Sequence, residues 1–237
     1  VNNSFRILQW NINGLCGKLK DKDFLSYIRS FDLICFVETF LESFHSNLFT
    51  DFISYYRSAI KFTKRGRPSG GIVCLIKKMY ASYIQRIDVD YPNIMVFLID
   101  KTMLNTEKDI LYICAYVPPE GSPFYSHFDI DCGISSLEEC LTDCLLKFDD
   151  VYIILSGDLN SRTADVNPTG MSNENIFPSL HMSQPVNLNR KSQDKVTNMY
   201  GKMLLNLCVT FYLCILNGVC EGDLQGCYAY ISDSGSS

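Results

Sequence analysis

The sequence has 237 residues, of which 47% are hydrophobic and 13% aromatic, and its formal net charge is −5. This composition excludes the disordered and fibrous classes of protein and is sufficient for one large hydrophobic core. The longest apolar stretch, residues 203–216, is interrupted by polar side chains and is shorter than the ~18 residues that a membrane-spanning helix needs. No linker or repeat divides the chain, so we expect one domain over residues 1–237 and no membrane association.

The cysteine pattern predicts free thiols. The eleven cysteines are an odd number, and several lie among Ile, Leu, Val and Phe, where a thiol acts as a small apolar residue: Cys35, Cys74, Cys114, Cys208 and Cys214. No Cys-x-x-Cys pair occurs, and Cys140 and Cys144 are one helical turn apart, so we expect no structural zinc. Reduced thiols indicate an intracellular compartment.

Along the first part of the chain, predicted strands alternate with helices. Residues 5–12 alternate apolar and polar side chains, which predicts a half-buried strand, and residues 20–30 have helical spacing. The apolar run over residues 32–38 predicts a buried strand that ends in a carboxylate. The same patterns predict four further strands and one helix, at residues 71–76, 94–100, 110–116 and 151–155 and at residues 134–148.

The last part of the chain is more polar. Residues 161–190 contain prolines and few apolar side chains, which indicates a surface segment, and helical spacing resumes over residues 192–207. A final strand pair is predicted at residues 212–216 and 228–231. Many short strands interleaved with helices favour an α/β fold in which two packed mixed sheets are flanked by helices as a four-layer sandwich.

Basic residues are concentrated in one stretch. Residues 52–87 contain eight of the 21 basic residues, Arg65 and Arg67 among them, and none of the 26 acidic residues. One interpretation is a solvated loop with edge strands. The other is one rim of a groove that binds a phosphate backbone, in spite of the negative net charge.

Polar residues stand at the ends of several predicted buried strands: Asn11, Glu38, Tyr116, Asp158 and Asn160. Active sites collect at strand ends, and a carboxylate that closes an apolar strand is costly to bury unless it is paired or bound to metal. Each residue also has a structural interpretation. The Gly-Asp-x-Asn segment and Asn11 can be turn residues, Tyr116 can be a core tyrosine, and Glu38 can begin a surface helix.

The motifs occur in the order Trp10-Asn11, Glu38-Thr39, Ser69-Gly70-Gly71-Ile72, Tyr116-Val117-Pro118-Pro119 and Gly157-Asp158-Leu159-Asn160. Over nearly the whole chain this order resembles the endonuclease/exonuclease/phosphatase superfamily, which has the deoxyribonuclease I-like fold. Two later features are more similar to the endonucleases of non-LTR retrotransposons: Ser161-Arg162-Thr163, and Leu216-Asn217-Gly218 followed by Gly222-Asp223 and Gly226.

The resemblance implies a role for each of the strand-end residues. Asn11 and Glu38 would hold Mg²⁺ or Mn²⁺, for which oxygen ligands are suited. Asp158 would orient or deprotonate the attacking water, and Asn160 would donate to a phosphate oxygen. Tyr116 would contact the scissile phosphate or an ionised neighbour. Phosphodiester hydrolysis needs these groups because water must be activated and growing charge neutralised.

The implied substrate is duplex DNA. By the same resemblance Asn217 reaches the substrate, and the basic stretch assigns Arg65 and Arg67 to substrate binding. The leading hypothesis is therefore a metal-dependent endonuclease that nicks DNA in the nucleus and is fused to a reverse transcriptase in a longer polypeptide. Alternatives are an abasic-site endonuclease, a lipid or inositol phosphatase of the same fold, and a remnant without catalytic activity.

Two features of the chain ends bear on activity. The sequence begins without Met or a signal peptide, which predicts a start inside a longer reading frame. The family pattern ends with an Asp in a Ser-x-Ile-Asp strand and an Asp-His pair, and neither motif occurs before Ser237. None of His45, His127 and His181 is expected to replace that His. We therefore expect a carboxy-terminally truncated copy that hydrolyses DNA slowly.

Overall fold

The computed structural model describes residues 4–44, 49–168 and 190–228. These residues belong to two compact units, 1–159 and 160–237. The expectation of a single domain stays a prediction. Among the described residues, no helix combines the length and the apolar character that crossing a membrane requires.

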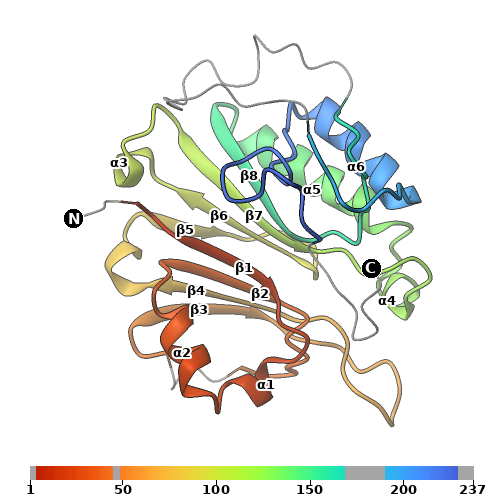
Figure 1. Ribbon diagram of the computed structural model, residues 1–237. Coiled ribbons are helices and arrows are strands. Elements are labelled where there is room, and N and C mark those ends of the chain that lie inside the picture. The colour runs from red at the N-terminus through yellow and green to blue at the C-terminus, as the bar shows by residue number, and fades with distance from the viewer. Residues whose placement is uncertain (1–3, 45–48, 169–189, 229–237) are drawn as a thin grey trace. The chain divides into compact units, whose positions relative to one another are not determined.

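The first unit contains two four-stranded sheets (Figure 1). The first sheet has the order β1-β2-β4-β3, with the bounds β1 Ile7–Asn11, β2 Leu33–Val37, β3 Phe52–Arg57 and β4 Ile72–Lys77. The second has the order β5-β6-β7-β8, with the bounds β5 Ile84–Ile87, β6 Ile94–Ile99, β7 Asp109–Tyr116 and β8 Val151–Asp158. Strands β1 and β2 are parallel, as are β7 and β8, and the other neighbours are antiparallel.

Short helices connect the strands of the first unit: α1 (Leu15–Lys18), α2 (Lys22–Ile28), the 3₁₀ turn η2 (Lys78–Tyr80), α3 (Lys101–Leu104), α4 (Pro123–Phe128) and α5 (Gly133–Lys147). Helix α2 begins after Asp21, whose side chain accepts the backbone N–H groups of Asp23 and Phe24. It buries Phe24 and Ile28. Helix α5 buries one apolar face and lies alongside the second sheet (Figure 1).

Alternate side chains of the central strands face two different cores. Leu33, Cys35 and Val37 of β2 point into the core between the two sheets, together with residues of β4, β6 and β7. Ile34 and Phe36 point the other way and pack with the apolar side of α2. Because β2 is buried on both faces, its sequence is a continuous apolar run rather than an alternating one. The two packed mixed sheets with flanking helices confirm the predicted fold class.

Every strand that the sequence predicted in the first unit is present. The strands β3 and β5 were missed, and each is one of the two edge strands of its sheet. Both lie in the basic stretch 52–87. The interpretation of that stretch as loops and edge strands is therefore correct in part, because the stretch also contains β4, an inner strand of the first sheet.

The second unit differs from the predictions. Its helix α6 spans Met199–Thr210 and begins later than predicted, because the Asn198 side chain caps it by accepting the Gly201 N–H. The strand predicted at residues 212–216 is wrong. Tyr212 has a left-handed φ of 54°, and the Leu213 N–H bonds back to the carbonyl of Cys208, so this segment closes the helix. Of residues 228–231, only Tyr228 is described, and it is not in a strand.

Candidate active site

The ends of four strands carry the predicted residues of the first unit. Asn11 is the last residue of β1, Glu38 follows β2 directly, and Tyr116 and Asp158 are the last residues of β7 and β8. The pair β1 and β2 ends in register at Asn11 and Val37, and the pair β7 and β8 ends in register at Tyr116 and Asp158. Because both pairs are parallel, each sheet presents two of these side chains at one edge.

Two hydrogen bonds join the sheets at this edge. The Asn11 side chain donates from Nδ2 to Oδ2 of Asp158 over 2.7 Å. The Tyr116 hydroxyl donates to Oε1 of Glu38, also over 2.7 Å. The structure thus brings together four residues that are as many as 147 positions apart in the sequence.

The backbone that carries Glu38 is strained. Asn13, Glu38 and Phe40 have positive φ angles of 45°, 53° and 56°, a conformation that non-glycine residues rarely adopt and that costs on the order of 1–3 kcal/mol. The segment is held by hydrogen bonds from the Gly14 N–H to the Glu38 carbonyl and from the Thr39 N–H to the Gly71 carbonyl. Surrounding contacts therefore fix the direction in which the Glu38 side chain points.

Two positions at this site require glycine because neighbouring atoms leave no room for a Cβ. Gly71 has a φ of 87°, and a Cβ there would lie 2.6 Å from Oγ1 of Thr39. Gly157, next to Asp158, has a φ of 139°, and a Cβ would lie 1.8 Å from the carbonyl oxygen of Ala115. The Gly-Gly and Gly-Asp motifs thus have a steric basis: a side chain would push apart the backbones that position Glu38 and Asp158.

The electrostatic environment keeps Tyr116 protonated. Burial raises the pKa of Tyr116 far above its usual value of 10, and the hydrogen bond and negative charge of Glu38 raise it further. Asp158 adds to this effect, and Arg67 opposes it. Tyr116 is therefore a neutral hydrogen-bond donor across the physiological pH range.

Arg67 lies beside this cluster, and no contact to the cluster is described for Arg65. The Arg67 guanidinium stacks on the Phe40 ring, 3.8 Å from its centroid, and approaches Oδ1 of Asn13 at 3.4 Å. The Arg65 side chain is exposed, and its backbone carbonyl accepts the Thr63 hydroxyl. Asn13 and Phe40 were not predicted from the sequence. Asn13 was detectable from its place two residues after Asn11, whereas nothing in the sequence pointed to Phe40.

The remaining predicted residues belong to the second unit or to helix α4, or are not described. Asn160 and Asn217 belong to the second unit: the Asn160 carbonyl accepts from Nδ2 of Asn198 at 2.9 Å, and the Asn217 carbonyl accepts from Nε of Arg190 at 3.0 Å. His127 is in α4 and contacts the rings of Phe62 and Phe128. His45 and His181 lie outside the described residues.

The donor atoms at the strand ends suit a hard divalent cation. Glu38 is half-buried and uses Oε1 to accept from Tyr116, and Oε2 has no hydrogen bond to the part of the chain that the structure describes. Oδ1 of Asn11 accepts the Asn13 N–H at 3.1 Å. Mg²⁺ is usually held by one or two carboxylates and keeps several waters, so Glu38 with the Asn11 oxygen fits such an ion.

Comparisons with known proteins agree with this architecture. The model of the Endonuclease/Exonuclease/phosphatase family matches residues 8–180. A search of curated protein sequences finds no match. Among solved structures, an AP endonuclease from Leishmania major is 15% identical, with a TM-score of 0.51, over 67% of this chain and 56% of its own. An AP endonuclease from Archaeoglobus fulgidus is 17% identical, with a TM-score of 0.47, over 86% and 71%.

A 3′ phosphatase from Neisseria, solved with a product DNA hairpin, is 14% identical with a TM-score of 0.45, over 68% of this chain and 60% of its own. The chain thus spans little more than half the length of the Leishmania enzyme that it resembles in fold. The fold of the first unit is deoxyribonuclease I-like, as predicted. Since the family model matches most of the sequence, the chain belongs to the Endonuclease/Exonuclease/phosphatase family.

Proposed function

We propose that this chain is a metal-dependent phosphodiesterase domain that nicks duplex DNA. The observation that carries the proposal is the pair of hydrogen bonds that join Asn11 to Asp158 and Tyr116 to Glu38 at the aligned ends of two parallel strand pairs. They gather two carboxylates, an amide and a neutral phenol in one place. Hydrolysis of a phosphodiester needs such a set because it requires a proton acceptor, a cation site and a hydrogen-bond donor together.

Each residue has a defined part in the proposed reaction. Glu38 and Asn11 would hold Mg²⁺ or Mn²⁺, which when bound would neutralise charge on the phosphoryl oxygens. The Asn11 amide fixes one oxygen of Asp158 and so orients this carboxylate, which would accept the proton of the attacking water. Tyr116 holds Glu38 in place through its single O–H proton, which would turn to a phosphate oxygen when substrate binds. The stacked guanidinium of Arg67 would bind a neighbouring phosphate.

The basic stretch favours DNA over a small phosphorylated substrate. Residues 52–87 have no acidic side chain, and Arg67 within them contacts Asn13 beside the strand-end cluster. A polyanion that extends from the site would meet positive charge there. An abasic-site endonuclease and a lipid or inositol phosphatase remain the alternatives, because the fold is shared by enzymes with different substrates.

We also propose a biological setting. The Ser161-Arg162-Thr163 and Leu216-Asn217-Gly218 segments support a retrotransposon-like polyprotein in which a reverse transcriptase follows the endonuclease. Such an enzyme would act on chromosomal DNA in the nucleus, and Asn160 and Asn217 of the second unit would contribute to substrate binding. Sequencing past Ser237 in the source transcript tests this setting, because a polymerase motif in the same reading frame is expected.

A nicking assay tests the proposed function. Supercoiled plasmid is incubated with the protein and Mg²⁺, and the Glu38→Gln variant is expected to lose about a hundredfold or more of the nicking rate, because the cation loses its charged ligand. Glu42→Gln, which changes an exposed glutamate nearby, is the matched control and should keep full activity.

Parallel reactions separate the alternatives. A duplex with a single abasic site and a phosphoinositide are offered under the same conditions. Cleavage restricted to the abasic duplex would make this a repair-type enzyme, and hydrolysis of the phosphoinositide without DNA nicking would exclude a nuclease. A folded protein that is silent on every substrate would be an inactive remnant.

A further inference from the structure

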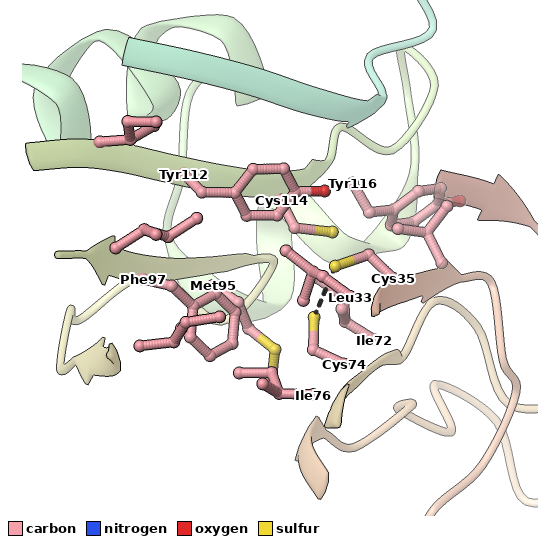
Figure 2. Packing of buried hydrophobic residues seen from close by; sticks show 14 residues of the cluster. Leu33, Cys35, Ile72, Cys74, Ile76, Met95, Phe97, Tyr112, Cys114 and Tyr116 are labelled. Atoms are coloured by element: carbon pink, nitrogen blue, oxygen red, sulfur yellow. Dashed lines mark hydrogen bonds between the residues drawn. The ribbon is translucent and has the colours of Figure 1, made fainter. Parts of the chain in front are cut away.

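Three buried cysteines meet in the core between the two sheets of the first unit. Cys35, Cys74 and Cys114 each have 0% exposure, and their sulfur atoms all lie within 4.8 Å of one another. The sulfur atoms of Cys35 and Cys74 are 3.2 Å apart. Figure 2 shows the three side chains pointing toward one another from β2, β4 and β7. The proposed hydrolysis of DNA uses none of them.

The fold, not the local sequence, creates this cluster. Cys35 and Cys74 are directly opposite each other in the antiparallel pair of β2 and β4. Cys114 comes from β7 in the facing sheet, where its opposite partner on β6 is Met95. The Met95 thioether belongs to the same buried cluster (Figure 2). Sulfur is thus concentrated in a core that otherwise contains only hydrocarbon side chains and tyrosines.

We propose that Cys35, Cys74 and Cys114 form a buried binding site for a soft monovalent metal ion, copper(I). Metal–sulfur bonds of about 2.3 Å in a planar three-coordinate arrangement place the sulfur atoms about 4.0 Å apart. The described separations, from 3.2 Å to at most 4.8 Å, bracket that value. A donor set made only of sulfur selects soft ions and rejects the hard cations that suit Glu38 and Asn11.

The number of ligands favours copper(I) over zinc. Structural zinc is almost always bound by four ligands in a tetrahedron. Within the described residues, the group that could hold a metal consists of these three cysteines. Leu33, Ile72 and Phe97 beside them have no donor atom, and the thioether of the neighbouring Met95 is a soft donor that suits copper(I) rather than zinc. A three-coordinate site without water suits a closed-shell monovalent ion.

The complete burial of the sulfur atoms determines how the ion would enter. With 0% exposure of all three residues, copper(I) would be captured while the sheets come together during folding, and the displaced thiol protons would pass to solvent. The bound ion would then link β2 and β4 to β7. Copper added to the folded protein should load slowly.

Refolding with copper tests the proposal. The protein is unfolded and refolded without oxygen in the presence of one equivalent of copper(I), desalted, and its copper content and X-ray absorption spectrum are measured. Exposed Cys16 and Cys227 are replaced by alanine in all samples to remove surface binding. We expect one copper per chain with a first shell of three sulfur atoms, and no retained copper in Cys35→Ala or Cys114→Ala.

A matched control is Cys144→Ala, which removes a buried thiol from α5 outside the cluster and should retain copper fully. Circular dichroism establishes that each variant folds, and Cys35→Val replaces Cys35→Ala if the smaller side chain prevents folding. The thermal midpoint should rise on copper loading in the background protein and stay constant in the cluster variants. Absence of retained copper, equal retention by the cluster variants, or a first shell of nitrogen and oxygen would each overturn the proposal.

Discussion

At the scale of single residues, the hydroxyl of Tyr116 is the contact that fixes Glu38. Tyr116→Phe removes the 2.7 Å hydrogen bond to Oε1 and leaves a half-buried carboxylate without this donor. A hydrogen bond to a charged group contributes about 1.5–3 kcal/mol, so we expect nicking to fall roughly tenfold to a hundredfold. The rate on supercoiled plasmid at saturating Mg²⁺ measures this. Tyr112→Phe, which removes a core phenol from the same strand, is the control, and an equal loss there would assign the effect to packing.

Because the pKa of Tyr116 is raised in the folded protein, we expect stability to depend on pH in the alkaline range. In the unfolded chain a tyrosine ionises near pH 10, whereas in the folded protein burial and Glu38 keep Tyr116 neutral at that pH. The unfolded state therefore binds fewer protons above pH 10, and the stability gained from the neutral phenol is lost as pH rises. Between pH 9 and 11 the urea midpoint of the wild type should fall more steeply than that of Tyr116→Phe. An equal fall of the urea midpoint in both proteins would contradict the assignment of this pH dependence to Tyr116.

At the scale of elements, Asn93 holds the end of β7 through two hydrogen bonds to the Tyr116 backbone. Its carbonyl accepts the Tyr116 N–H at 2.9 Å, and its side chain donates to the Tyr116 carbonyl at 2.7 Å. Asn93 is 3% exposed, so Asn93→Ala leaves a buried carbonyl without its donor and should lower the free energy of unfolding by about 1–3 kcal/mol.

As a positioning residue, Asn93 should also affect catalysis through Tyr116. Asn93→Ala is expected to lower kcat with little change in KM, and adding it to Tyr116→Phe should cause no further loss of kcat. Additive effects of the two changes would mean that Asn93 acts on stability alone. The exposed Asn206→Ala in α6 is the control for both measurements.

Some of these elements could be predicted from the sequence and others could not. The strand β2 is buried on both faces, so its apolar run and the carboxylate after it identified both the strand and Glu38. Edge strands β3 and β5 carry few fully buried side chains and therefore lack that signal. Asn93, and the clustering of the three core thiols, escaped prediction because each depends on partners that only the folded sheets bring near. The segment after α6 was mistaken for a strand because its apolar residues close a helix instead.

At the scale of the whole molecule, charge is polarised: the net charge is −5, yet residues 52–87 are free of acidic side chains. Binding of DNA through such a stretch releases counterions, so affinity should fall linearly with the logarithm of salt concentration. Arg67→Ala should weaken binding of a duplex oligonucleotide uniformly across sequences and reduce the salt slope by about 1, because one phosphate contact is lost.

The matched control for that experiment is Lys147→Ala, which removes one exposed basic residue from α5, outside the basic stretch. Both variants change the net charge by the same amount, so a general effect of charge would alter their salt slopes equally. An unchanged slope for Lys147→Ala with a reduced slope for Arg67→Ala would place a phosphate beside the Phe40 ring, on which the Arg67 guanidinium stacks. Equal slopes would indicate that DNA does not bind beside the strand ends. They would contradict a polyanionic substrate at Glu38 and Asp158.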